Sequence, residues 1–559
     1  MSEFKECQTP DAAQAEAEWH ASGATKPPRA VMQARLAMLG GLLLCGVPYL
    51  VSAALPKDDP KQDKVADFMA WLPEDGTPFL RIFEHKHTPV VVADADPTGG
   101  GDAPIPETPE LVIEPVAVEP TKSTTTVVDV VEAAPDAAPS DPDSEAVDVP
   151  PPPTPEPPED PYARIHIPPE TWAGMTTFIE DPNNVLATFY DALAKAALKT
   201  PNHKVLISQW GDSCIAADGM TSAARRLLQR VFGDGGHGYM MLAANNPWYR
   251  QKDIDLSASG WTAEEFIRDQ AEDGRYGYGG VAAVGYQGSK ASFATVTEPA
   301  SSGAVSGAAA SQMLIYYLVQ KGGGTLTAKV DGVEKATYDT RSPDGEKVDK
   351  LDVVKVEDGA HTFELRNSGG GKTKVYGVSI ERDQGLVYDG MGTVGARDTR
   401  WLNADKDHTE RMLKMRSPDL AILMYGGNAL VDDNTMEWYE GKLTEVVRIW
   451  REALPNKACL LMSPIDHGER CRKGTCTVPR QLDLMKVQRK VALAEGCAWF
   501  SIYDAMGGEG TIGKWLDTGL ANSDLSHPTG KGSVELGLLW YKALMKGFAD
   551  FITTHTPTP

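Results

Sequence analysis

From residue 203 onward, short apolar segments alternate with amphipathic segments in this 559-residue chain, and this alternation restricts the fold most. The apolar segments include "HKVLISQW" (203–210) and "PDLAILMYGGNAL" (418–430). The amphipathic segments, such as "EWYEGKLTEVVRIWREAL" (437–454), have apolar residues at helical spacing. Strand–helix alternation of this kind predicts an α/β domain, a parallel sheet with helices on both faces.

A segment with a different pattern, residues 258–385, separates these α/β units. It contains short alternating strands broken by glycines and Asp-Gly turns, as in "GGGTLTAKVDGV" (322–333). This pattern predicts an all-β module of sandwich type. Because strand–helix units lie on both sides, we expect the module to divide the α/β domain into a first part, 163–257, and a second part, 386–552.

An uncharged apolar segment, residues 36–55, lies near the start of the chain. Its length is sufficient to cross a bilayer as one helix. Three basic residues precede it, which favours a cytoplasmic N-terminus. We therefore expect a cytoplasmic tail (1–30) and a single-pass transmembrane anchor (31–55) in the inner membrane. The alternative is a signal-like segment that is cleaved.

Residues 56–162 are rich in proline and in acidic residues. Between residues 91 and 161 the chain has 17 Asp and Glu residues and one Lys, which is most of the net charge of -24. A segment with so few large apolar residues cannot bury enough surface to fold, and its prolines stiffen it. We predict a mostly disordered spacer between the membrane and the folded domain. We do not expect nucleic acid as a partner, because the chain has an excess of acidic residues and proteins that bind nucleic acid present a basic patch.

Seven cysteines are few for a disulfide scaffold. Cys471 and Cys476 in "CRKGTC" are placed to close a small loop in an oxidising compartment, and a pair of free loop cysteines is the equal alternative. No second Cys or His pair at zinc spacing lies nearby, so we expect no metal site. We expect no organic cofactor either.

A serine stands between a predicted strand and a predicted helix in "QWGDSCIAADGM" (209–220). One explanation is capping, because Asp and Ser are common residues at helix N-termini. The other is that Ser213 is a nucleophile at the C-terminal end of a strand, where open α/β sheets build their sites. Such a nucleophile needs a base, a carboxylate that orients the base, and an oxyanion hole.

Asp524 and His527, in the polar loop "SDLSHPTG" (523–530), have the spacing of such a pair. Taken alone, an Asp-x-x-His sequence is equally well explained as a loop cap. Together with the Gly-Asp-Ser turn, it predicts that His527 takes the proton of Ser213 and that Asp524 holds the imidazole tautomer. Three other histidines of the C-terminal region lack this setting: His408, His467 and His555.

In these motifs the chain resembles the SGNH/GDSL hydrolases. The first block of that family is matched by the Gly-Asp-Ser turn at Ser213, the third by "YGGNAL" at Asn428, and the fifth by "DLSHP", which holds Asp524 and His527. The resemblance covers about residues 165–550. It implies a flavodoxin-like parallel sheet and a carboxylic ester hydrolase with a Ser-His-Asp mechanism.

The resemblance also implies an oxyanion hole, formed by the Ser213 N–H, a glycine N–H and the Asn428 side chain. The glycine lies in the second block, "VYDGMGTVGAR" (387–397), where Gly395 fits best and Gly392 is the alternative. These donors act on the negative charge that grows on the carbonyl oxygen during acyl transfer.

The chain departs from the family pattern at two places. Cys214 follows the serine where leucine or histidine is common, and "TVG" replaces an Asn-Gly pattern in the second block. Cys214 is an alternative nucleophile, but nothing in the sequence indicates a lowered thiol pKa. Ser213 keeps the position of the motif and is therefore favoured.

Three tracts in and around the inserted β segment are "GHGY" (236–239), "GYGG" (277–280) and "VYGVSIERDQGLVYDGMG" (375–392). In these tracts the segment is similar to the carbohydrate-binding-like sandwich of cell-wall (peptidoglycan) O-acetylesterases, which lies between the first and second blocks. This likeness implies an acylated polysaccharide substrate and a catalytic domain in the periplasm or outside the cell. Four aromatic residues are candidates for sugar stacking, with sandwich core as the alternative role: Trp261, Tyr286, Tyr316 and Tyr317.

The sequence thus predicts a membrane-anchored esterase that removes O-acyl groups, chiefly O-acetyl, from an envelope polysaccharide such as peptidoglycan. Two alternatives stay open. The same triad serves an O-acyltransferase that passes the acyl group to an envelope glycan. A wall-binding protein with a vestigial site is the other.

Overall fold

The computed structural model describes residues 105–114, 160–296, 306–472 and 474–554. These residues belong to one compact unit, Asp94–Pro559. The predicted cytoplasmic tail and transmembrane anchor lie outside the described residues. Within the described ranges, no helix combines the length and apolar character that a membrane crossing requires.

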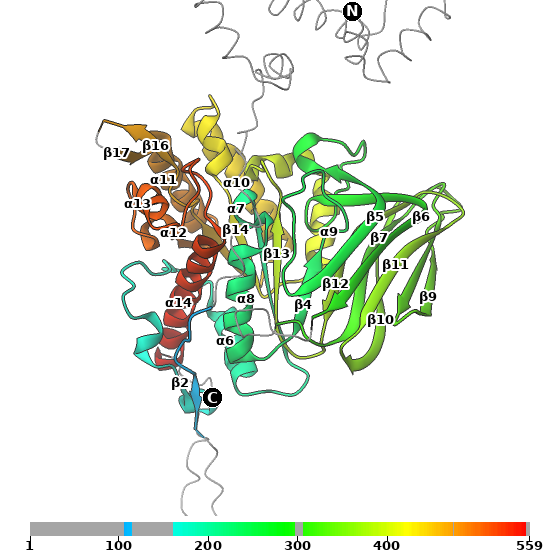
Figure 1. The fold of residues 1–559 in the computed structure, drawn as a ribbon, viewed down its shortest axis with the longest axis horizontal. Helices are drawn as coiled ribbons and strands as arrows, with labels where there is room; N and C mark the ends of the chain where they lie inside the picture. Colours follow the sequence, from blue (N-terminus) through cyan, green and yellow to red (C-terminus); the bar gives the residue numbers. More distant parts are fainter. Residues whose placement is uncertain (1–104, 115–159, 297–305, 473, 555–559) are drawn as a thin grey trace, which may run out of the picture. The chain divides into compact units, whose positions relative to one another are not determined.

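A five-stranded parallel sheet forms the centre of the α/β part (Figure 1). Numbered along the chain, its strands lie in the order 2-1-3-4-5, which is the flavodoxin-like order that the resemblance implies. Ligands of such sheets bind where the strand order reverses, at the carboxyl ends of the strands. In sheet order the strands are β13 (Gly385–Gly392), β3 (Lys204–Gly211), β14 (Leu420–Met424), β15 (Ala458–Met462) and β18 (Ala498–Phe500).

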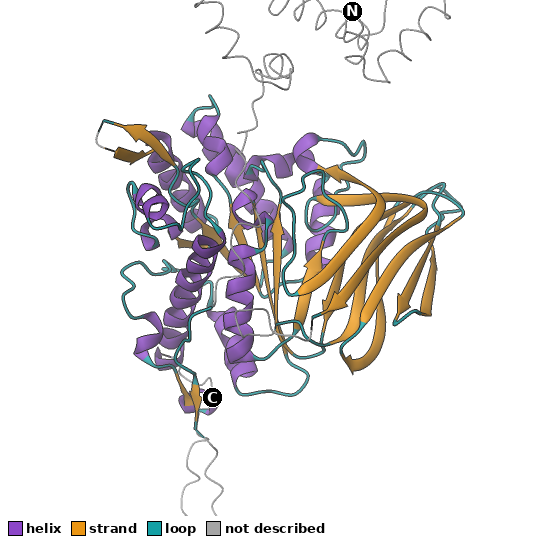
Figure 2. Ribbon diagram, in the orientation of Figure 1, coloured by secondary structure: helices purple, strands orange, loops and turns teal. Residues whose placement is uncertain are grey.

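Helices cover both faces of this sheet (Figure 2). Strand β14 shows why both faces are apolar: Leu420 and Ile422 belong to one core cluster, whereas Ala421 and Leu423 belong to the other. Alternate side chains of a strand point to opposite faces. One face is covered by α6 (Ala187–Ala197), α8 (Gly219–Phe232) and α14 (Gly530–Thr554). The other is covered by α9 (Lys406–Arg416), α10 (Met436–Ala453) and α11 (Pro479–Ala494).

Several short elements complete the α/β part. Three are α-helices: α7 (Ser213–Ala216), α12 (Ile502–Ala505) and α13 (Thr511–Asp517). Two form an antiparallel hairpin: β16 (Gly468–Cys471) and β17 (Gly474–Thr477). The 3-10 helices are η3 (Pro161–Arg164), η4 (Pro169–Trp172), η5 (Phe266–Arg268), η6 (Asp398–Asn403) and η7 (Gly427–Val431).

The inserted module is one large antiparallel sheet of nine strands with its own apolar core. Central strand β6 pairs with β5, β11 and β12, so the strands stay in one hydrogen-bonded network. The strands are β4 (Gly236–Met240), β5 (Ile254–Glu265), β6 (Val281–Thr295), β7 (Ala310–Val319), β8 (Thr325–Val330), β9 (Val333–Asp339), β10 (Val348–Gly359), β11 (Thr362–Gly369) and β12 (Thr373–Glu381).

The module begins earlier than the predicted boundary at residue 258. Strand β4 already pairs with β12, and β5 starts at Ile254. The sequence of β4 hides this strand because Gly236 and Gly238 interrupt its apolar pattern, and glycine within a strand is a weak strand former. Both glycines adopt positive φ angles, 97° and 102°.

Part of the predicted disordered spacer is folded, and this corrects the sequence-based expectation. Ile105 is only 6% exposed and belongs to the core of the α/β part. Strand β1 (Val112–Ile113) pairs with β2 (Ile165–His166). Leu111 packs against the same core. Composition averaged over the whole segment concealed these few apolar side chains, whose burial is sufficient to hold the short strand on the domain.

Two of the four aromatic candidates for sugar stacking belong to the core instead. Tyr316 and Tyr317 are buried on β7, because this strand lies inside the large sheet and both of its faces are covered. Trp261 is half-buried and packs over Gly285. Tyr286 is 64% exposed.

Two disulfides lie in the α/β part. Cys471–Cys476 closes the β16–β17 hairpin, which decides between the two alternatives that the sequence left open for this pair. Cys459–Cys497 joins β15 to the residue before β18. The second bond was not expected, because its partners are 38 residues apart in sequence and meet only in the folded sheet.

Candidate active site

Ser213 is the first residue of α7, directly after the turn that ends β3. Asp212 is the helix cap, and its Oδ1 accepts a hydrogen bond of 3.0 Å from the Cys214 N–H. The N–H of Ser213 has no acceptor among the described residues. A Cβ atom at Gly211 would lie 2.7 Å from the Met424 carbonyl oxygen, so only glycine fits this turn. Asp212 therefore caps the helix, and the side chain of Ser213 is not needed as a cap.

The structure brings Ser213, His527 and Asp524 together in one hydrogen-bonded chain. Ser213 Oγ lies 2.8 Å from Nε2 of His527, and Nδ1 of His527 lies 2.7 Å from Oδ2 of Asp524. A carboxylate can only accept, so Nδ1 carries the proton and Nε2 is left to accept from the serine hydroxyl. Asp524 Oδ1 also accepts from the N–H groups of Ser526 and His527. The arrangement is that of a Ser-His-Asp triad.

The loop that carries Asp524 and His527 is tight. Leu525 has a φ of 58°, in the left-handed region that bulky residues rarely adopt. The Asn522 N–H donates to the His527 carbonyl, and the Leu525 N–H donates to the Asn522 carbonyl. Backbone strain of this kind costs about 1–3 kcal/mol and persists only where the surrounding structure enforces it.

Charges around His527 favour its protonated form. Burial alone would lower the pKa of His527, but the hydrogen bond and charge of Asp524, together with the charge of Asp212, raise it above the usual 6.5. Burial likewise opposes ionisation of Asp524, but its bonds to His527 outweigh burial and hold its pKa below 3.8. The two shifts agree, since each partner stabilises the charge of the other.

The candidate oxyanion residues Gly395 and Asn428 lie beside each other. Residues 393–396 form a turn in which the Ala396 N–H donates to the Thr393 carbonyl, and Gly395 has the φ of 82° that a type II turn requires. The Asn428 side chain, on η7, donates from Nδ2 to the Ala396 carbonyl at 3.1 Å. The Gly395 N–H has no acceptor among the described residues.

Gly392 has a different environment. It ends β13 opposite Gly211, and a Cβ atom there would overlap the backbone of Ala216 in α7. The next residue, Thr393, donates its N–H to the Gly211 carbonyl. Because successive N–H groups of a strand point to opposite sides, the N–H of Gly392 points away from the strand that leads to Ser213.

Cys214 carries a free thiol that is buried. Burial and the neighbouring charge of Asp212 raise the pKa of its thiol well above the usual range. A reactive cysteine needs the opposite shift. This result agrees with the choice of Ser213.

His467 was set aside in the sequence analysis, yet it lies at the same edge of the sheet, next to Gly427 and Asn428. The charges of Asp212 and His527 act on its pKa, which places it in the neighbourhood of the triad. Its position directly after the fourth apolar strand was the available signal, since all parallel strands end at one edge.

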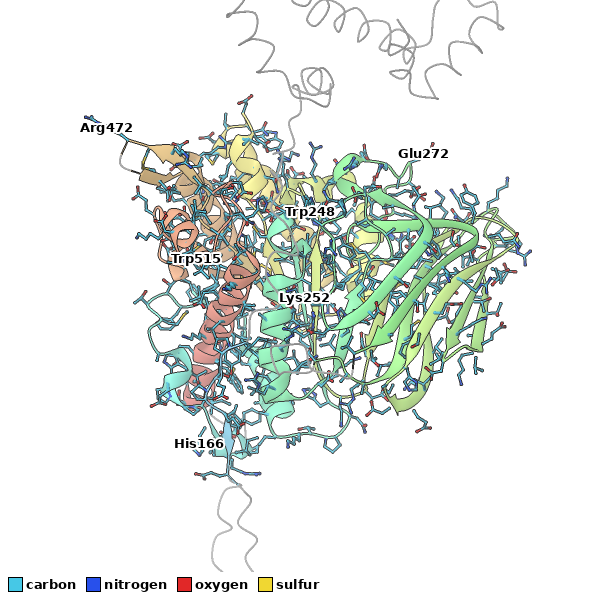
Figure 3. All side chains as sticks on the ribbon, viewed as in Figure 1. His166, Trp248, Lys252, Glu272, Arg472 and Trp515 are labelled. Atoms are coloured by element: carbon cyan, nitrogen blue, oxygen red, sulfur yellow. A yellow bond between two sulfur atoms is a disulfide. The ribbon has the colours of Figure 1, made fainter. Side chains whose placement is uncertain are left out.

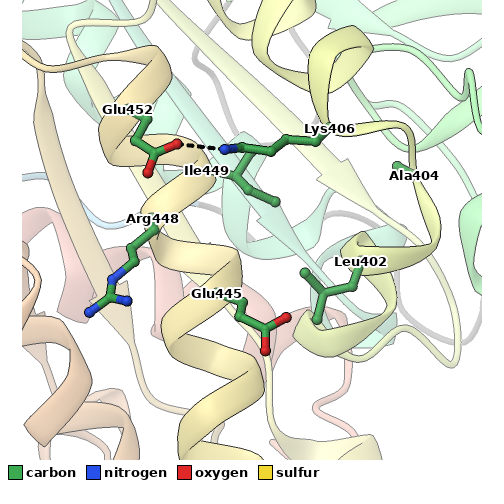
Figure 4. Close-up of a pocket in the computed structure, with 7 residues that line it drawn as sticks. All are labelled: Leu402, Ala404, Lys406, Glu445, Arg448, Ile449 and Glu452. Atoms are coloured by element: carbon green, nitrogen blue, oxygen red, sulfur yellow. Dashed lines mark hydrogen bonds and ion pairs between the residues drawn. The ribbon is translucent and has the colours of Figure 1, made fainter.

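A hollow of the described surface, about 300 Å³ in volume, is lined by none of these residues (Figure 4). Its charged side chains are paired with one another or with neighbours. Lys406 binds Glu452 at 2.7 Å, and Arg448 binds Glu495 at 2.9 Å. Within the described ranges, no three His, Cys, Asp or Glu side chains are grouped to hold a metal ion.

Comparison with known proteins supports the fold. No protein-family model and no curated protein matches this chain. Among solved structures, it is similar to a peptidoglycan O-acetylesterase, with 23% identity and a TM-score of 0.55 over 66% of this chain and 99% of that protein.

Two other solved structures match with TM-scores that are too low to support a conclusion about the fold. A family two carbohydrate esterase from Cellvibrio japonicus has 10% identity and a TM-score of 0.23, over 53% of this chain and 98% of that one. The C-terminal CBM6 of a marine laminarinase from Zobellia galactanivorans has 13% identity and a TM-score of 0.16, over 23% and 98%. The chain thus shares its fold with a peptidoglycan O-acetylesterase.

Proposed function

We propose that this protein is a serine esterase that removes O-acyl groups, foremost O-acetyl, from a cell-envelope polysaccharide such as peptidoglycan. One observation carries the proposal: Ser213, His527 and Asp524 form a hydrogen-bonded chain at the carboxyl edge of the parallel sheet. The fold it shares with a peptidoglycan O-acetylesterase supports the substrate class.

In the proposed reaction, Ser213 Oγ attacks the ester carbonyl while His527 Nε2 takes its proton. The tetrahedral intermediate collapses to an acyl-enzyme, and His527 returns the proton to the departing sugar hydroxyl. Water then attacks the acyl carbonyl with His527 again as the base. Collapse of this second tetrahedral intermediate breaks the bond to Ser213 Oγ, which takes the proton back from His527, and releases the acyl group as a carboxylic acid. Asp524 keeps the imidazole in the required tautomer and stabilises its charged form. These steps use only water and groups of this chain.

We assign the oxyanion hole to the N–H groups of Ser213 and Gly395 and to the amide of Asn428. Both N–H groups lack an acceptor among the described residues, and one N–H of the Asn428 amide remains available after its bond to Ala396. Gly395 is favoured over Gly392 as the oxyanion donor, because the Gly392 N–H points away from the strand that leads to Ser213.

Asn428→Ala should lower kcat by about 100- to 1000-fold, because one donor to the developing oxyanion is lost. KM should change little, since this donor acts on charge that is absent from the ground state. Steady-state kinetics on a small activated acetyl ester measures both constants. An increase in KM with an unchanged kcat would contradict the assignment.

Activity should rise with pH through a midpoint above 6.5. The base must be neutral to accept the serine proton, and the raised pKa of His527 keeps it protonated to a higher pH than a free histidine. Asp212→Asn should move this midpoint to lower pH, because one negative charge that raises the pKa is removed while an Asn cap is retained. The profile of kcat/KM against pH checks both statements. A wild-type midpoint below 6.5, or no shift in Asp212→Asn, would speak against this electrostatic picture.

We further propose that the folded domain lies on the periplasmic or outer side of a membrane, held by residues 31–55. Its two disulfides support an oxidising compartment. Thiol labelling of protein taken directly from cells, followed by mass spectrometry, tests this. Free thiols at Cys459 and Cys497 would exclude that location.

The experiment that tests the function is acetate release from O-acetylated peptidoglycan, with Ser213→Ala beside the wild type. Since Ile105 packs into the domain, a soluble fragment should begin at Asp94 rather than after the spacer. Serine-dependent release supports the proposal. Acetyl transfer to an added glycan without net release would identify a transferase. Binding to cell-wall sacculi with no turnover of any ester would identify a wall-binding protein.

A further inference from the structure

His467 is held with its imidazole against the segment that carries Asn428. A Cβ atom at Gly427 would overlap Nε2 of His467, so the ring occupies the space of a side chain at that position. His467 follows β15, and Asn428 follows β14, the neighbouring strand of the sheet. The histidine therefore stands at the carboxyl edge, on the oxyanion side of Ser213.

Three hydrogen bonds of His467, and one between two of its partners, fix the orientation of this residue. Nδ1 of His467 lies 2.9 Å from the Ile465 carbonyl, and the His467 N–H donates to Oε1 of Gln481 at 2.9 Å. The His467 carbonyl accepts from the Val478 N–H. Gln481 is buried and also donates to the Ile465 carbonyl, at 2.6 Å. The backbone and the ring of His467 are thus set before any ligand binds.

The β16–β17 hairpin, which follows His467, ties it to the loop of the triad. The Gly468 N–H donates to the Leu525 carbonyl at 2.7 Å. Buried Asp466 accepts from the Thr477 hydroxyl and from the Ile512 N–H. The Cys471–Cys476 disulfide closes the hairpin, and Arg472 at its tip points into solvent (Figure 3). These contacts fix the position of His467 relative to the loop that carries Asp524 and His527.

Only one end of the imidazole is unused. Nε2 has no hydrogen-bond partner in the described part of the chain, and it is not among the unpartnered polar atoms sealed from solvent. Because Nδ1 faces a carbonyl, Nδ1 carries the proton and Nε2 is an acceptor. Burial lowers the pKa of His467, so the neutral form is the relevant one. As a neutral acceptor, Nε2 of His467 cannot stabilise an oxyanion. It can accept a hydrogen bond from a donor group on the substrate.

We propose that His467 is a substrate-contacting specificity residue, whose Nε2 accepts a hydrogen bond from a hydroxyl or amide N–H of the sugar that carries the ester. This inference rests on the proposed function. It predicts that the enzyme distinguishes acylated sugars from esters whose alcohol part has no donor. The selected substrate is an O-acylated sugar with a free donor beside the ester.

The test compares two esters in the full-length protein. With O-acetylated peptidoglycan, His467→Leu should lower kcat/KM by about 10- to 100-fold, because a directed hydrogen bond is lost. With p-nitrophenyl acetate, which offers no donor, kcat/KM should change by less than about threefold. His467→Gln places an acceptor near the former Nε2 and should recover most of the loss, whereas the shorter His467→Asn should behave like leucine.

The outcomes separate this proposal from the proposed function. Ser213→Ala must abolish hydrolysis of both esters, and if it does not, the proposed function fails whatever His467 does. Equal losses on both esters in all three His467 variants would make His467 a positioning residue and overturn the proposal. Unchanged activity of His467→Leu on peptidoglycan would overturn it as well. Retention of the Cys471–Cys476 bond and of the melting temperature shows that each variant is folded.

Discussion

Ser213→Ala should reduce kcat for ester hydrolysis by about 10⁴- to 10⁶-fold, the largest change that one substitution makes in this protein. Alanine leaves His527 without a nucleophile to deprotonate, while the proposed oxyanion donors remain. The residual rate then comes from these donors and from substrate binding. Because the serine side chain makes a single hydrogen bond, to His527, the free energy of unfolding should change by no more than about 1 kcal/mol.

Cys214→Ala is the matched control for this prediction. Cys214 is adjacent to Ser213 and carries the other candidate nucleophile, but its thiol is buried with a raised pKa. We expect this variant to keep most of the wild-type kcat. Single-turnover kinetics on an activated acetyl ester measures acyl-enzyme formation in both variants. Loss of activity in Cys214→Ala with retention in Ser213→Ala would transfer the nucleophile to the cysteine.

Arg416→Met should lower the free energy of unfolding by about 3–5 kcal/mol, because it leaves buried carboxylates without their partner. Arg416 ends α9 and is buried. Its Nε and Nη2 donate to the two oxygens of Asp389 on β13, at 3.0 and 2.7 Å. Its Nη1 binds Glu381, the last residue of β12 in the inserted module. This cation therefore joins the two sheets at one point.

The charge state of Glu381 gives the pH dependence of that loss. Burial opposes its ionisation, but Arg416 and Lys204 outweigh burial and lower its pKa to about 2. A depressed pKa contributes stability above the unfolded value of 4.5, and this contribution is lost as pH falls toward 2. The difference between wild type and Arg416→Met should therefore be largest near neutral pH and shrink in acid.

Urea denaturation at several pH values measures this difference. Arg341→Met is the control, since Arg341 pairs with Asp339 on the exposed surface of the same module, where solvent screens the pair, and its loss should hardly change the free energy of unfolding. A loss for Arg416→Met as small as that of the control would show that the buried cluster does not hold the two sheets together. A pH-independent loss would show that packing rather than charge is responsible.

Much of the site was predictable because its groups are local in sequence. Asp212 and Ser213 occupy one strand–helix turn, and Asp524 and His527 occupy one loop, so their relative positions follow from local geometry. That the two groups meet depends on the parallel sheet, which the strand–helix alternation predicts in kind. Assignment of their chemical roles remains a prediction that the kinetic experiments address.

Other features were invisible because they join residues that are distant in sequence. His467 has no Asp three residues before it, unlike His527, and its nearness to Asn428 follows from the adjacency of β14 and β15. Cys459 and Cys497 meet for the same kind of reason, across β15 and β18. Ile105 lies in a polar segment of the sequence, and the core that buries it forms only in the folded domain.

The sequence by itself determined the α/β class, the β insertion and the residues that can form a triad, because periodicity and turn chemistry act over a few neighbouring residues. Only the tertiary structure decided the order of the strands, the orientation of the Gly392 and Gly395 N–H groups, and the placement of His467. These depend on which segments pack side by side, and that choice is made by burial summed over the whole domain.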